Sequence, residues 1–271
     1  MRSKCFIFLV FVLLITSYVC GGPIIGSSAN TIKSKSFMFE SHISYTPYSA
    51  RYYTDGEEWI GFSEDESNVV IGFLPQLYYG VFDFLTIRLT APVNMHKIDY
   101  GVSEKSTGIG DIIIDFKHRL LNGKLFIPTV SWFGGVRLPT GDKKVSPALG
   151  DGSTDAVVGI LVTEHILKLS SHSKVGYWLN GKVDDVDIPN MFFYNEALEY
   201  GLPLKFAFVT ELNGFISGSG NEQRYCMEFC PGINNKLFPN LVLEASVKIP
   251  IWARLGLRYD YSPFVGFMYL F

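Results

Sequence analysis

The last strand-like stretch of the chain most constrains its fold. In residues 262–271 one face of the expected strand is apolar and ends on an aromatic residue: Pro263, Val265, Phe267, Tyr269 and Phe271. An apolar strand at the very end of a sheet leaves an unpaired edge, which soluble proteins avoid. In a closed barrel the last strand pairs with the first, so that both edges disappear. The terminal stretch therefore favours a barrel, with the buried last strand of a soluble all-β domain as the alternative.

The same period of two runs from Phe37 to the end, broken by clusters of Asn, Gly, Asp, Ser and Pro. It predicts about twelve strands, at 36–46, 68–79, 84–95, 109–120, 124–138, 154–167, 173–183, 193–202, 205–217, 223–234, 240–250 and 260–271. Long connections, such as 46–67, 96–107 and 139–153, alternate with short ones, such as 121–123 and 202–204. This asymmetry is typical of outer-membrane barrels, and an even strand number leaves both termini on the periplasmic side. We therefore expect an all-β, closed antiparallel transmembrane β-barrel.

Composition separates this barrel from a soluble sandwich. Charged residues make up 18% of the chain, against about 25% in average domains. The polar faces of the strands carry few charges of mixed sign, whereas the solvent face of a sandwich should be rich in Lys and Glu. The net charge of -3 implies no broad basic surface, so nucleic acid is not an expected partner.

The first 22 residues have the pattern of an export signal. Arg2 and Lys4 precede an apolar run over 5–19, and small residues follow at 20–22. We expect a cleaved signal peptide at 1–22 and a barrel over 23–271. Cys20 raises lipidation as an alternative, although Val19 is a poor residue before a lipidated Cys.

Two cysteines remain after such a cleavage. Cys226 and Cys230 are four positions apart in a predicted strand, which separates their Cα atoms by roughly 13 Å at about 3.3 Å per residue. A disulfide needs less than about 7 Å. We expect free thiols, and the spacing predicts neither a metal site nor a cofactor.

Polar faces of the strands should line the barrel lumen, because a charge facing lipid at mid-depth costs roughly 2–4 kcal/mol. The lumen-lining candidates are Asp115, Lys117, Arg119, Arg137, Lys205, Glu211, Glu228, Glu244 and Lys248. Aromatic residues near strand ends are expected in the membrane-interface girdles: Tyr78, Tyr79, Trp132, Trp178, Tyr259 and Tyr261.

Three Gly- and Asp-containing motifs occur in a fixed order: Thr-Gly-Ile-Gly-Asp at 107–111, Leu-Pro-Thr-Gly-Asp at 138–142 and Leu-Gly-Asp-Gly-Ser at 149–153. No helix is expected after the first motif, so dinucleotide binding fails its structural test. We expect turns, in which Gly supplies bends and Asp caps amides. The turn residues are Gly108, Gly110, Asp111, Pro139, Thr140, Gly141, Asp142, Gly150 and Gly152.

In this order the motifs resemble the outer-membrane family named for the meta-pathway of phenol degradation, over about residues 68–271. The resemblance implies a barrel that passes small hydrophobic or aromatic compounds and is not a catabolic enzyme. Phe267, Tyr269 and Phe271 also resemble the terminal assembly signal of bacterial outer-membrane barrels. The expected partners are therefore outer-membrane lipid, the barrel-assembly machinery and a small-molecule solute.

The first third of the chain departs from this resemblance. A long connection holds six acidic residues, Asp55, Glu57, Glu58, Glu64, Asp65 and Glu66. A solvated loop is the simpler interpretation, and a hard cation held by carboxylates is the alternative.

Two other functions compete with a channel. A non-conducting barrel could bind a partner through its long loops. A lipid-modifying enzyme would need a nucleophile and a base, but no Gly-x-Ser-x-Gly elbow occurs. We therefore expect a bacterial outer-membrane channel or transporter for small, hydrophobic or aromatic compounds, with no catalytic residues.

Overall fold

A computed structural model describes residues 22–53, 58–124, 126–184, 186–220, 223–254 and 256–271. The expected signal peptide lies almost entirely outside these residues. The described chain is nearly all strand, and no helix within it is long and apolar enough to cross a membrane.

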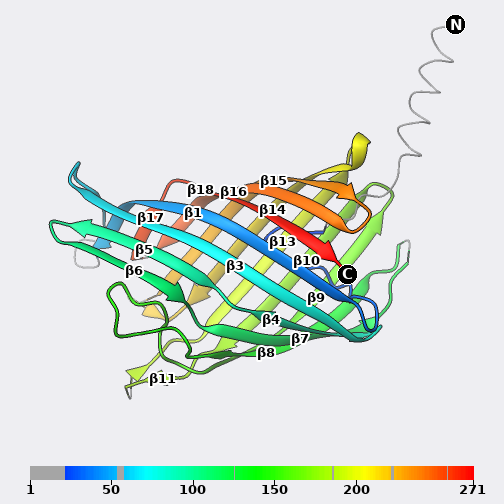
Figure 1. Ribbon diagram of the computed structural model, residues 1–271, viewed down its shortest axis with the longest axis horizontal. Helices are drawn as coiled ribbons and strands as arrows, with labels where there is room; N and C mark the ends of the chain where they lie inside the picture. The colour runs from blue at the N-terminus through cyan, green and yellow to red at the C-terminus, as the bar shows by residue number, and fades with distance from the viewer. Residues whose placement is uncertain (1–21, 54–57, 125, 185, 221–222, 255) are drawn as a thin grey trace, which may run out of the picture.

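Twelve antiparallel wall strands close into a barrel (Figure 1). Three of them are interrupted and are each formed by two segments: β4–β5, β6–β7 and β17–β18. The wall consists of β1 (Phe37–Tyr53), β3 (Glu66–Phe82), β4 (Leu85–Thr90) with β5 (Val93–Tyr100), β6 (Ser103–Ile109) with β7 (Ile112–Leu121), β8 (Thr129–Leu138), β9 (Asp155–Ile166), β10 (Leu169–Leu179), β13 (Met191–Gly201), β14 (Phe206–Ser217), β15 (Arg224–Phe238), β16 (Leu241–Arg254), and β17 (Leu257–Tyr259) with β18 (Ser262–Leu270).

The barrel closes between its first and last strands. β1 pairs with β3 on one side and with β18 on the other, from Met38 opposite Leu270 to Ser44 opposite Phe264. The backbone amide of Phe271 donates to the carbonyl oxygen of Phe37 at 2.8 Å. The prediction that the terminal strand pairs with the first is confirmed, and we call the β1–β18–β16 region the seam.

The two faces of the wall differ as expected. Ile43 and Val265, paired across the seam, are 52% and 57% exposed on the outside. Glu40 and Glu244 are buried inside. An apolar exterior and a polar interior are what lipid requires of a spanning barrel.

The predicted aromatic girdle is only half right. Tyr79, Trp132 and Tyr261 are exposed. Tyr78 and Tyr259 are buried, because their hydroxyls bond to Glu40 and Glu228. Trp178 packs against a buried cluster around Phe133. Side-chain parity along the strand, and not position near its end, decides which aromatics face outward.

The two mouths of the barrel differ in their connections. At the short-turn mouth, where Phe37 and Phe271 lie, tight turns join β3 to β4 and β9 to β10. At the long-loop mouth are the 139–154 connection and the small strands β2 (Glu58–Gly61), β11 (Lys182–Val183) and β12 (Val186–Asp187). The long connection expected at 96–107 is instead mostly strand, in the projecting β5–β6 hairpin.

Candidate functional site

A segment that the sequence gave no reason to single out occupies the lumen. Residues 22–36 precede β1 and have almost no regular structure, yet Ile24 is 2% exposed and Ala29 is fully buried. We call these residues the inner segment. They lie inside the barrel because their backbone groups are bonded by polar side chains of the wall, so that few polar groups remain unpaired there.

Glu211 of β14 holds the deepest part of the inner segment. Its carboxylate accepts hydrogen bonds from the backbone amides of Ile24, Ile25 and Gly26, at 2.5, 2.8 and 2.9 Å. Asn195 donates to the same carboxylate at 2.8 Å. Hydrogen bonds to an ionised acceptor are about twice as strong as neutral ones, so Glu211 is the main anchor.

A second anchor holds the returning half of the inner segment. The amide of Ala29 donates to Thr163 Oγ1 at 2.8 Å, and Ser131 Oγ donates to the carbonyl oxygen of Ala29 at 2.5 Å. Lys117 Nζ donates to the carbonyl oxygen of Ser28 at 2.7 Å. These contacts come from β9, β8 and β7, so the inner segment bridges several parts of the wall.

Apolar packing accompanies both anchors. Ile24 packs on Val209 and Phe264, and Ala29 packs in a cluster with Phe133 and Leu161. The lumen is therefore a packed interior at these levels and not an open water-filled pore.

Cavities remain around the inner segment. One of about 330 Å³ lies towards the seam, between Ile24 and His42. A second of about 220 Å³ lies between Ile25 and Phe193 on β13. Because a cavity of about 150 Å³ accommodates benzene, each of the two has room for a single-ring compound.

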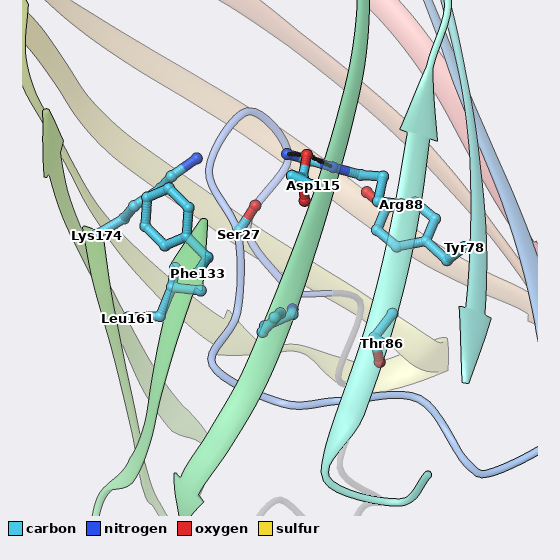
Figure 2. Close-up of a pocket in the computed structure, with 9 residues that line it drawn as sticks. Ser27, Tyr78, Thr86, Arg88, Asp115, Phe133, Leu161 and Lys174 are labelled. Carbon is cyan, nitrogen blue, oxygen red and sulfur yellow. Dashed lines mark hydrogen bonds and ion pairs between the residues drawn. The ribbon is translucent and has the colours of Figure 1, made fainter. Parts of the chain in front are cut away.

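Charged and aromatic side chains meet in a further pocket, which shares Arg88 and Lys174 with the larger cavity (Figure 2). Arg88 on β4 donates from Nε to Asp115 Oδ2 on β7 at 2.8 Å. Lys174 on β10 places its Nζ 5.0 Å from the centre of the Phe133 ring and 5.3 Å from that of Phe193. A cation over aromatic rings beside a partly apolar cavity suits a compound with a flat, electron-rich face.

The predicted lumen residues fall into groups by position. Lys117 and Glu211 bond the inner segment, and Asp115 lines the pocket that Ser27 of this segment also lines. Glu244 and Lys248 line the seam side, where Lys248 Nζ lies 5.8 Å from the centre of the Phe264 ring. Glu228 lines the smaller cavity.

The remaining three candidates lie towards the ends of the wall. Arg137 is at the long-loop mouth, where it pairs with Asp151 and Asp155 at 2.6 and 2.5 Å. Arg119 is near the short-turn end of β7. The placement of Lys205 in a strand was wrong: it lies exposed in a 3₁₀ turn, Pro203–Lys205, because Pro203 interrupts the wall before β14 begins.

The three Gly-Asp motifs come together at one place. Asp111, between β6 and β7, accepts hydrogen bonds from the amides of Gly141 and Asp151 at 2.9 and 3.2 Å. Thr140 Oγ1 donates to the carbonyl oxygen of Gly110 at 2.9 Å. A Cβ on Gly150 would lie 2.4 Å from Asp111 Oδ1. The motifs thus fasten the 139–154 connection to the break between β6 and β7.

The other turn residues of the motifs sit around this contact. Gly108 lies within β6, and Gly152 has a φ of +82°. Asp142 Oδ1 accepts from the amide of Lys144 at 2.8 Å, and Pro139 is in the same connection.

The acidic residues at 55–66 and the two cysteines were also singled out in the sequence. Asp55 and Glu57 lie outside the described residues. The solvated-loop interpretation is wrong for Glu58 and Glu66, which lie in β2 and β3, and Glu66 is bonded to Arg51 Nη2 at 2.5 Å and to the Ser63 amide at 3.0 Å. Cys226 and Cys230 are free and buried.

One Ser–His contact exists that the sequence did not indicate. Ser170 Oγ and His165 Nδ1 are 2.8 Å apart, and the two residues are directly opposite in the β9–β10 ladder. Ser170 is 5% exposed. Cross-strand register accounts for this contact, since residues directly opposite in a ladder are close neighbours.

Comparison with known proteins shows which family and which solved structures the chain is similar to. The family model described as "Putative MetA-pathway of phenol degradation" matches residues 64–260. No curated protein matches the chain. An outer membrane channel from Pseudomonas putida F1 is similar in structure, with a TM-score of 0.76 at 11% identity, covering 92% of this chain and 100% of that one.

Two further barrels are similar at lower scores. The CymD monoaromatic hydrocarbon channel has a TM-score of 0.51 at 8% identity, covering 89% of each chain. The translocator domain of the autotransporter NalP from Neisseria meningitidis has a TM-score of 0.50 at 10% identity, covering 99% of this chain and 96% of that one. These likenesses show a shared barrel fold of the bacterial outer-membrane type.

Proposed function

Because this chain belongs to the phenol-degradation MetA-pathway family, we propose that it is a bacterial outer-membrane channel for small hydrophobic or aromatic compounds. The observation that carries the proposal is the pair of cavities beside the inner segment, each of a size for one aromatic ring and lined by Phe and Lys side chains, with Arg88 beside the larger one. A likeness in fold to a monoaromatic hydrocarbon channel and to a second outer membrane channel supports it.

The inner segment makes this channel selective. A solute that enters from the long-loop mouth, which faces the outside, meets the cavities first and the inner segment next. Passage towards the periplasm requires the inner segment to leave Glu211 or to shift beside the solute. Large polar solutes are excluded, because the remaining space is small and is divided by the inner segment.

The surroundings of the barrel follow from its exterior. The exposed apolar face contacts outer-membrane lipid, and the aromatic terminal strand is recognised by the barrel-assembly machinery. We propose no catalytic role for Ser170 and His165, since the two residues are a cross-strand pair in the β9–β10 ladder and Ser170 is buried.

Single-channel conductance of the refolded protein in a planar bilayer tests the proposal. The variant is Glu211→Gln, in which the side-chain amide faces backbone amide donors in place of the carboxylate. We expect release of the inner segment to become more favourable by about 2 kcal/mol, or roughly 30-fold. Conductance should rise accordingly, and an aromatic solute should block the wild-type steps.

The matched control is Glu66→Gln, which removes a carboxylate that bonds Arg51 and the Ser63 amide at the long-loop mouth, away from the two cavities and the inner segment. It should conduct like the wild type. A folded wild type and Glu211→Gln variant that both lack conductance and solute flux would refute the channel and support a partner-binding barrel.

A further inference from the structure

Three strands at the seam bring together one row of residues. Glu244 on β16 lies opposite Gly266 on β18, and Gly266 lies opposite His42 on β1. A Cβ on Gly266 would lie 2.2 Å from His42 Cδ2. The glycine therefore leaves space over the middle strand, and His42 Nε2 crosses it to reach Glu244 Oε2 at 2.8 Å.

A second carboxylate completes this group. Glu40 precedes His42 by two positions and shares its inward face, with Oε1 3.7 Å from His42 Nε2. One donor atom from each of Glu40, His42 and Glu244 lies within 4.8 Å of the other two. Donors bound to one ion at about 2.1 Å are at most about 4.2 Å apart, so small side-chain rotations are enough to enclose an ion.

The second carboxylate oxygen of Glu244 points to a missing ligand. Glu244 is 4% exposed, and among the described residues Oε1 has no hydrogen-bond partner. Lys248 lies on the same strand face, but its Nζ is over Phe264, and no ion pair in the described part of the chain joins it to Glu40 or Glu244. A buried carboxylate oxygen without a partner is costly, and a bound cation removes that cost.

We propose that Glu40, His42 and Glu244 bind a divalent first-row transition-metal ion. One imidazole and two carboxylates suit Zn²⁺, Co²⁺ or Mn²⁺ better than a soft ion, which prefers thiolates. Glu40 is oriented by Tyr78, whose hydroxyl donates to Oε2 at 2.7 Å; such outer contacts fix metal ligands in position. The cavity of about 330 Å³ is lined by Glu40 and His42 and has room for water ligands.

The ion would join β1 to β16 across β18. It would add a link between the beginning and the end of the chain at the place where the barrel closes. Its consequence is a barrel whose unfolding temperature depends on the metal, independently of any solute transport.

The test uses the full mature chain, purified folded and freed of metal with a chelator. Co²⁺ is added first, because its visible absorption reports an imidazole–carboxylate environment, and Zn²⁺ binding is then measured by competition. We expect about one ion per chain, as one set of ligands requires, and a higher unfolding temperature with Zn²⁺.

His42→Gln and Glu244→Gln each remove a direct ligand. Each should weaken Zn²⁺ binding by about 100-fold or more, since loss of even an outer-contact residue costs 10–100-fold. His96→Gln, on β5 away from the seam, is the matched control and should bind like the wild type.

Three results would overturn the proposal: no saturable Co²⁺ spectrum in the wild type, equal binding by wild type and both ligand variants, or loss of binding in His96→Gln alone. The wild-type spectrum decides the question even where a variant fails to fold, and heat-modifiable gel mobility establishes which variants are folded.

Discussion

The barrel wall is continuous where β1 pairs with β18 and is interrupted at β6, and the two regions are held in different ways. At the seam, β1 and β18 form a regular ladder from Met38 to Ser44. Among the described residues β6 pairs with β5 only, and its other edge faces the 139–154 connection. That connection is held by Asp111 and by Ser146 Oγ, which donates to Glu104 Oε2 at 2.5 Å.

Because the two regions are held differently, they should contribute differently to the stability and to the local motion of the barrel. A ladder repeats one interaction along its length, so its strands separate only as a unit. The β6 edge depends on a few side-chain contacts, each of which can open alone, and regions with few such contacts open at low free energy. We expect the seam to carry the stability of the barrel and the β6 edge to carry its local motion.

Substitution at Gly266 should break the seam and have the largest effect. In Gly266→Val the new Cβ lies 2.2 Å from His42 Cδ2 and 2.7 Å from the backbone oxygen of Ser41, which cannot move without disturbing the ladder. We expect a loss of about 3 kcal/mol or more, at the upper end of overpacking costs. Urea titration followed by heat-modifiable mobility measures it.

Gly61→Val is the matched control for the seam, because the nearest atom to its new Cβ is 4.0 Å away. A Gly266→Val barrel as stable as this control would contradict the assignment of stability to the seam.

Substitution of Asp111 should open the β6 edge without unfolding the barrel. Asp111→Ala leaves the amides of Gly141 and Asp151 without their acceptor, at a cost of about 2 kcal/mol. Trypsin should then cut at Lys143 or Lys144 roughly 30-fold faster where local opening limits cleavage. Mass spectrometry identifies the cut.

The control for this region is Asp142→Ala, which removes only the exposed cap on the Lys144 amide. Equal cleavage in the two variants would show that Asp111 does not hold the connection.

A cross-link between β6 and the 139–154 connection should change solute flux with little effect on the stability of the barrel. Cysteines at Glu104 and Ser146, joined by a short bifunctional thiol reagent, fix the connection to β6. If hydrophobic solutes leave sideways through this edge, their flux into lipid vesicles should fall severalfold while ionic conductance stays the same. A fall in both would place the solute and the ions on one path through the lumen.

The sequence predicted the wall well, because lipid imposes one rule on every strand. Outward Val265 and inward Glu244 could be assigned from alternation alone, and the twelve strands followed. Lys205 was misplaced because the predicted strand began at residue 205, whereas the turn Pro203–Lys205 extends one residue further. The β5–β6 hairpin was missed because residues 96–107, which contain Gly101 and several Ser and charged residues, were predicted to be a connection.

The interior could not be predicted in the same way. Residues 23–36 show no alternation, and their anchors, Thr163 and Glu211, are remote in sequence and become neighbours only when the barrel closes. The Glu40–His42–Glu244 group depends on the register of three strands and on one glycine between them. The spacing of these three residues along the sequence does not indicate that they lie together.

The inner segment has both of its ends at the same mouth of the barrel. The carbonyl oxygen of Gly22 is bonded by Asn234 near the end of β15, and the amide of Lys35 is bonded to Gly80 near the end of β3. The segment therefore enters the lumen from the short-turn mouth and returns to it. Its Lys35 end continues into β1, so the segment can leave the lumen and go back while the first and last strands stay paired.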